Sequence, residues 1–73
     1  MEEELVNEYI GKYVYLTIGN RFDYCFIDKK IGECLKLILV NVISTVSWKE
    51  ILTIRELTEK EIRMFKEKKG DSR

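Results

Sequence analysis

The sequence predicts a mainly β protein: a small, strongly bent, five-stranded antiparallel barrel of the SH3-like or OB-like kind, with a short N-terminal helix and a C-terminal helix. Three observations lead to this fold class. The chain has 73 residues, which is enough for one domain with a single modest core. Apolar and polar residues alternate over several short segments, as in strands that are buried on one side. Tight connections separate these segments and favour antiparallel neighbours.

A helix over residues 2–10 is expected to begin the domain. Three glutamates occupy positions 2–4, where negative side chains favour the positive end of a helix dipole. Apolar residues then recur at helical spacing as far as Ile10. Gly11 follows, and glycine readily takes the left-handed conformation that ends a helix.

The first β-hairpin is predicted over residues 12–28. Residues 12–18 alternate between aliphatic side chains, which we assign to the core, and a polar or aromatic set. Gly19 and Asn20 are a two-residue hairpin signal. Residues 21–28 resume the alternation and place three aromatic side chains on a common face: Phe22, Tyr24 and Phe26.

Three further strands complete the predicted sheet. The next apolar segment is rich in Leu, Ile and Val, which is typical of a strand buried on much of both faces. The expected order is a charged connection at 29–33, a strand at 34–43, a polar break at Ser44-Thr45, and short strands at 46–48 and 51–57 on either side of Lys49-Glu50.

A C-terminal helix is predicted over residues 58–69. Thr58 and Glu61 fit a capping box, in which each side chain accepts a hydrogen bond from a backbone amide at the helix start. Apolar residues three apart then give the helix one apolar side. Residues 70–73 are expected to form a frayed tail, so that the whole chain is one domain, 1–73.

Composition excludes several function classes. Thirteen basic and thirteen acidic residues cancel, unlike in proteins that coat nucleic acid without sequence preference. The chain has no histidine, and Cys25 and Cys34 lack a metal-binding spacing, so we expect no metal, cofactor or disulfide. No leader or membrane segment is visible, which favours a cytoplasmic location. With no histidine, phosphate loop or activated nucleophile, we expect no enzymatic activity.

The strand at 51–57 is predicted to be an edge that another chain can pair with. Residues 51–54 are almost entirely apolar and the segment has no proline. Arg55 is the only charged residue before Glu56 that would discourage another chain from pairing with this edge. A domain this small often needs association with other copies for stability. We therefore expect a dimer or a ring in which this segment pairs with a second copy.

Two stretches of the chain resemble the Sm-like proteins, and within them the bacterial and archaeal RNA chaperone Hfq. YVYLTIGNRF (13–22) is similar to the first strand and glycine hairpin of the family. VNVISTVSWKEILTIREL (40–57) is similar, without a gap, to its last two strands. The middle segment needs about three extra residues around 29–33 to align. In the second stretch, WKEILT stands where Hfq has Tyr-Lys-His followed by a small apolar and Ser/Thr run.

The resemblance implies a cytoplasmic ring of six or seven subunits, with a homohexamer expected. Each subunit would donate its last strand to its neighbour's fourth, and the ring would bind single-stranded RNA, a small RNA or an mRNA, and promote RNA pairing. No DNA or membrane partner is expected. Lys49 would contact RNA at the pore and Trp48 would shape that site. Glu50 replaces the family histidine, and is expected to pair with a neighbouring Lys49 or to recognise a base edge.

Two further sets of residues are implied as RNA contacts. The family places a stacking aromatic before its third strand, where this chain has Leu35 and Lys36. On the opposite face of the ring, Hfq holds purine-rich RNA with a tyrosine of the first strand and with hairpin residues. The residues at these positions are Tyr15, Gly19, Asn20, Arg21 and Phe22, and among them we expect Tyr15 to act together with Arg21.

Alternatives from other classes remain open. Residues 48–50 also fit an ordinary polar turn, and the aromatic residues of the hairpin also fit the filling of a small barrel. The whole chain fits an SH3-like protein-interaction module without RNA affinity, which would be a monomer or a dimer. The remaining basic residues are expected to be solvated or to contact phosphates along a rim: Lys29, Lys30, Lys66, Lys68 and Lys69.

Overall fold

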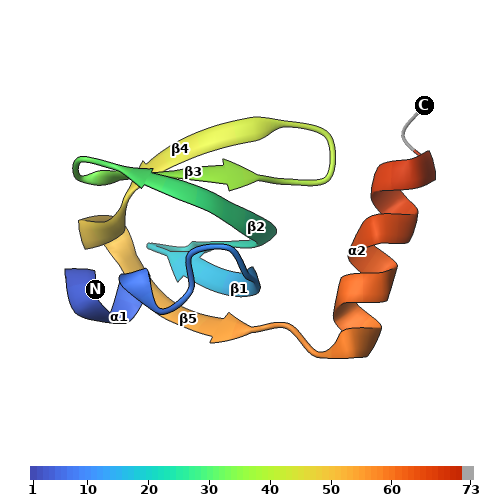
Figure 1. The fold of residues 1–73 in the computed structure, drawn as a ribbon, viewed down its shortest axis with the longest axis horizontal. Coiled ribbons are helices and arrows are strands. Elements are labelled where there is room, and N and C mark those ends of the chain that lie inside the picture. The colour runs from blue at the N-terminus through green and yellow to red at the C-terminus, as the bar shows by residue number, and fades with distance from the viewer. Residues whose placement is uncertain (72–73) are drawn as a thin grey trace.

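The computed structural model describes residues 1–71, which form one five-stranded antiparallel sheet with a helix at each end (Figure 1). This confirms the predicted mainly β class, the five strands and both helices. The elements are α1 (Glu3–Asn7), β1 (Tyr13–Ile18), β2 (Arg21–Ile31), β3 (Cys34–Ile38), β4 (Ile43–Ser47), the 3-10 turn η1 (Trp48–Glu50), β5 (Ile51–Glu56) and α2 (Glu59–Asp71).

The strand order is β4-β3-β2-β1-β5, which leaves β4 and β5 at the two edges. These two edge strands do not pair with each other, so the sheet does not close into the expected barrel. Within the chain, β5 pairs with β1 along one side only, with Tyr15 opposite Arg55 and Leu16 opposite Ile54. Its other side therefore has no partner in the described part of the chain.

Two predicted boundaries in the middle of the chain are wrong. The segment 29–33 is not a connection, because β2 continues to Ile31 and only Gly32 and Glu33 form the turn. Lys29 and Lys30 remain in the strand on opposite faces of the sheet. Lys29 is exposed to solvent, and Lys30 lies on the core side, where it forms an ion pair with Glu3 of α1. Gly32 supplies the positive φ, 61°, that this tight turn requires.

The expected strand at 34–43 is wrong: β3 ends at Ile38, and β4 begins only at Ile43. The chain turns back at Val40-Asn41, where the Leu39 amide donates a hydrogen bond of 2.8 Å to the Val42 carbonyl. Ser44 and Thr45 do not break the sheet, because they lie inside β4 opposite Leu37 and Lys36. The continuous apolar character of this segment concealed the turn.

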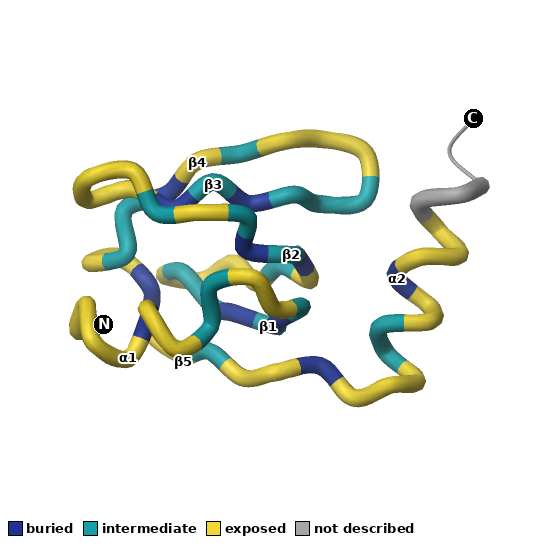
Figure 2. The backbone as a smooth tube through the Cα atoms, viewed as in Figure 1, coloured by how far each residue is buried: buried dark blue, intermediate teal, exposed yellow. Residues whose placement is uncertain are grey.

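One face of the sheet carries the hydrophobic core, as the alternation in β1 predicted. Helix α1, which is shorter than the predicted 2–10, adds Val6 to this face, and no polar or charged side chain is buried among the described residues. Burial, assisted by the Asp23 carboxylate, raises the pKa of the Cys25 thiol to about 12. Figure 2 marks the buried positions along the backbone; the core residues are Val6, Val14, Leu16, Cys25, Ile27, Leu35, Leu37, Val46 and Ile51.

Helix α2 stands beside the other face of the sheet (Figure 1). Its start matches the predicted capping box: the Glu61 amide donates to Thr58 Oγ1 at 3.2 Å, and the Thr58 amide donates to Glu61 Oε1 at 3.0 Å. Phe65 in the helix and Leu57, which precedes it, are both buried. The helix includes residues 70 and 71 of the predicted tail, whereas residues 72–73 and the side chains of residues 69–71 lie outside what the structure describes.

Candidate functional site

The turn η1 joins the two edge strands and carries Trp48, Lys49 and Glu50. Its conformation is fixed locally, because Ser47 Oγ accepts a hydrogen bond of 3.3 Å from the Lys49 amide and the Trp48 amide donates 3.0 Å to the Glu33 carbonyl. The indole N–H of Trp48 is buried and has no acceptor among the described residues. A buried donor without a partner costs about 1–3 kcal/mol.

The Lys49 ammonium is exposed but already engaged. Its Nζ lies 2.9 Å from Glu33 Oε1 and 5.7 Å from the centre of the Trp48 ring. Within the chain, the carboxylate that pairs with Lys49 is therefore Glu33, which was not among the predicted site residues. Glu33 and Lys49 come together only in the folded chain. Cys34 pairs with Ser47 in the sheet, and this pairing places the turn after β2 beside η1. Any phosphate that Lys49 binds has to compete with this carboxylate.

Leu35 and Lys36 are not brought together as a contact site. Leu35 is fully buried in the core, so a base cannot stack on it. Lys36 lies on the opposite face of β3 and pairs with Asp28, with 3.6 Å between Nζ and Oδ2. The replacement of a stacking aromatic by these two residues thus leaves no exposed stacking surface at this position.

On the other face, Tyr15 and Phe22 gather with Tyr24 into an aromatic cluster, which we call the open trio. The ring centres lie 5.7 Å apart for Tyr15–Phe22, 5.0 Å for Tyr15–Tyr24 and 6.5 Å for Phe22–Tyr24. Phe22 is 59% exposed and Tyr24 is 42% exposed. The exposed Gly19-Asn20 turn follows β1 directly.

The structure does not bring Arg21, the expected partner of Tyr15, next to that ring. Arg21 lies on the face of β2 opposite to Phe22, where its Nε is 3.6 Å from Asp23 Oδ2. The cation over the Tyr15 ring is instead Arg55, whose guanidinium carbon is 5.0 Å from the ring centre. Sequence reasoning missed Arg55, because only the register of β5 on β1 places it opposite Tyr15.

Arg55 is also held by α2. Its Nη1 and Nη2 donate hydrogen bonds to Glu61 Oε1 and Oε2, both at 2.9 Å. These bonds, followed by the hydrogen bond from the Thr58 amide, lower the pKa of Glu61 to about 2. The same bonds raise the pKa of Arg55 above its ordinary value. The pair is a bidentate clasp between the open trio and α2, and we call it the Arg55–Glu61 clasp.

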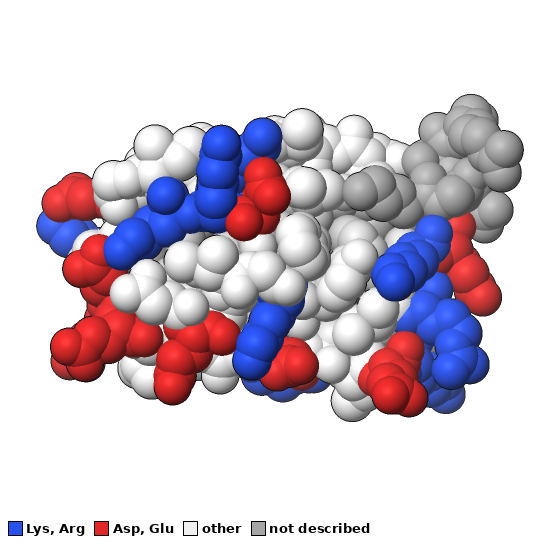
Figure 3. All heavy atoms as spheres, in the orientation of Figure 1, with Lys and Arg blue, Asp and Glu red and all other residues white. Residues whose placement is uncertain are grey.

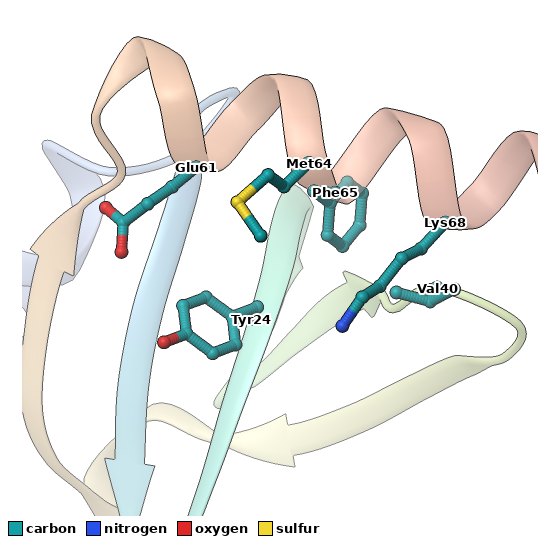
Figure 4. A pocket seen from close by; sticks show the side chains of 6 residues that line it. All are labelled: Tyr24, Val40, Glu61, Met64, Phe65 and Lys68. Carbon is teal, nitrogen blue, oxygen red and sulfur yellow. The ribbon is translucent and has the colours of Figure 1, made fainter.

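A groove of about 260 Å³ separates α2 from the sheet (Figure 4). Tyr24 is its wall on the sheet side, Met64 and Phe65 are its wall on the helix side, and Val40 of the β3–β4 turn closes one end. The Lys68 side chain extends toward this space, whereas the Glu61 carboxylate points away along β1 and β5. The groove and the open trio share Tyr24, so they form one continuous surface.

Charge is evenly mixed around these features. On the face shown in Figure 3, basic and acidic side chains alternate without a broad basic field. Among the described residues, no three His, Cys, Asp or Glu side chains gather to hold a metal ion. Within the same part of the chain, no helix has the length and apolar character needed to cross a membrane.

Comparison of the chain with family models, with curated proteins and with solved structures returns no significant match.

Proposed function

We propose that this protein is an Sm-like, Hfq-type RNA-binding protein that assembles into a ring, most simply a homohexamer, and binds single-stranded RNA at the pore. The observation that carries the proposal is the position of η1 between two unpaired sheet edges. In the Sm arrangement the fourth strand of one subunit pairs with the fifth strand of the next. The strand order β4-β3-β2-β1-β5 leaves those same two strands available.

Exposed apolar side chains support association at these edges. Leu52 on β5 is 62% exposed and Ile43 on β4 is 61% exposed, and Val42 beside Ile43 is similarly open. Edge strands of this kind favour pairing with another chain. A closed ring also removes both edges at once, which a single pairing in a dimer does not.

A cyclic arrangement would repeat Lys49 at equivalent positions around an axis. Each lysine would exchange Glu33 for an RNA phosphate, and this exchange makes each contact weak. Six weak contacts on one strand nevertheless give useful affinity, because each contact after the first is effectively intramolecular. A ring that holds two RNAs in this way would favour their pairing.

The proposal is tested by native mass and by RNA binding. We expect light scattering to give a mass near six subunits, and Lys49→Ala to lower the affinity for oligouridylate at least tenfold, about 1.4 kcal/mol or more. Lys60→Ala is the matched control, because it removes the same charge from an exposed position on α2. A monomeric mass, or equal losses in both variants, contradicts the proposal.

A second candidate is an SH3-like protein-interaction module without RNA affinity. The groove beside α2 supports it, because that groove offers apolar walls of the size of one or two side chains. The zero net charge of the sequence is also compatible with a protein partner. This function predicts a monomer or a dimer and no binding of oligouridylate or oligoadenylate at moderate salt.

A further inference from the structure

Arg55 lies at the boundary between an exposed stacking surface and a helix. Its guanidinium covers Tyr15, and the same group makes both hydrogen bonds of the Arg55–Glu61 clasp. A carboxylate and a phosphate present similar pairs of oxygens to an arginine, and both suit its planar fork. Glu61 therefore occupies the position on Arg55 where a phosphate would bind.

We propose that Glu61 is an intramolecular competitor for Arg55, and that single-stranded RNA displaces it when its bases stack on the open trio and a phosphate binds the guanidinium. This inference rests on the proposed RNA-binding function and adds two residues, Arg55 and Glu61, that the family resemblance did not assign. It deepens that function by naming how access to one face is regulated.

The open trio has the properties of a stacking surface for bases. Its three rings lie on neighbouring positions of β1 and β2, with 5.0 to 6.5 Å between their centres. Folding leaves Phe22 and Tyr24 substantially exposed. Aromatic surfaces on a sheet, combined with a cation for the backbone, are the usual means of holding single strands without strict sequence preference.

The exchange does not require α2 to unfold or to leave the sheet. Glu61 keeps its hydrogen bond from the Thr58 amide, and Thr58 Oγ1 keeps the one from the Glu61 amide. Phe65 remains packed on Tyr13, with ring centres 5.6 Å apart. Only the Arg55 side chain, which is half exposed, has to change partner.

The groove extends this surface beyond Arg55. Tyr24 belongs to the open trio and to the groove wall, and the Lys68 side chain lies at the far end of that wall (Figure 4). A strand that stacks on the trio can therefore meet one cation at each end, Arg55 and Lys68. The clasp masks only the first of these two cations.

The test uses Glu61→Gln in the full chain and a short labelled oligoadenylate, chosen because purines offer the largest stacking area. Glutamine keeps the capping box but removes the charge that holds Arg55. We expect the affinity to rise about three- to fivefold, the range in which a solvent-exposed ion pair contributes. Glu67→Gln is the control, because Glu67 lies on the same helix and makes no ion pair with the described residues.

Salt dependence and a third variant complete the test. Rising salt weakens the clasp in the wild type and so partly offsets the loss of RNA contacts. Glu61→Gln lacks this offset, and its affinity should fall more steeply with salt. Arg55→Gln should bind oligoadenylate more weakly than the wild type. The double variant with Arg55→Gln and Glu61→Gln should bind no more tightly than Arg55→Gln alone.

Three results would overturn the inference. One is a gain in Glu61→Gln no larger than in Glu67→Gln, and another is unchanged binding in Arg55→Gln. The third is the absence of oligoadenylate binding in both the wild type and Glu61→Gln. Because ring mass and Lys49-dependent binding of oligouridylate are measured separately, either of the first two results can occur while the proposed function stands.

Discussion

The two faces of the sheet are built from different side chains and are buried to different extents in the folded protein. The core face is aliphatic, and its central members, such as Leu16 and Leu37, have no exposed surface. The other face is aromatic and is only half covered: Phe65 of α2 packs on Tyr13, which contacts Phe26, while the open trio stays in solvent. One face thus supplies stability, and the uncovered half of the other is available for recognition.

The largest expected effect is the difference in stability lost when a side chain is truncated on the core face and on the aromatic face. Leu37→Ala should lower the free energy of unfolding by about 2–5 kcal/mol, because it removes a fully buried side chain and leaves a cavity. Phe22→Ala should lower it by no more than about 1 kcal/mol, since that ring is largely exposed and mainly contacts its aromatic neighbours. Urea titrations of both variants check this, and equal losses would remove the distinction between the faces.

Truncation of a side chain in the covered half of the aromatic face should have an intermediate effect on stability. Phe65→Ala should cost about 1–3 kcal/mol, below the cost of a fully enclosed core phenylalanine, because Phe65 packs against a sheet face that is partly open. Amide exchange should quicken in α2 and remain slow in β1 and β2. Matching acceleration in the strands would show that α2 is part of the main cooperative unit.

The smallest expected effect is the pH dependence of the Arg55–Glu61 clasp. The folded pKa of Glu61, about 2, lies below its ordinary value of 4.5. Its contribution to stability is therefore complete above pH 4.5 and is lost as the pH falls toward 2. The stability difference between the wild type and Glu61→Gln should shrink over that interval.

Urea titrations at pH 5, 3 and 2 measure this difference. In an Arg55→Gln background the same comparison should lose most of its pH dependence, because Arg55 is the first cause of the shift. A pH dependence that survives intact in that background would assign the effect to Thr58 and the helix start.

Local patterns predicted the elements whose signal is contained in neighbouring residues. The alternation in β1, the Gly19-Asn20 turn and the Thr58–Glu61 capping box all appear as expected. The turn at Val40-Asn41 was missed, because apolar residues on both sides hide it and no glycine marks it. Whether the sheet closes depends on contacts between its edges, and local alternation carries no information about these.

The candidate site was less predictable than the elements. Tyr15 and Phe22 were identified, but their cation was assigned to Arg21, which precedes Phe22 in the hairpin. The actual neighbour, Arg55, comes from a strand about forty residues later and is placed by register. The carboxylates that hold Lys49 and Arg55 also come from distant or separate elements. Such pairings become visible only when the strand order is known.

Arg55 belongs to β5, the strand whose outer side is unpaired. A subunit that docks along that side would change the surroundings of the residue that faces the stacking surface. Reciprocity then requires that whatever assembly does to the affinity for a polynucleotide, the polynucleotide does to assembly, by the same factor. Titrations at different protein concentrations would consequently give different apparent dissociation constants for the polynucleotide. The size of that change would measure the coupling between subunit assembly at β5 and polynucleotide binding.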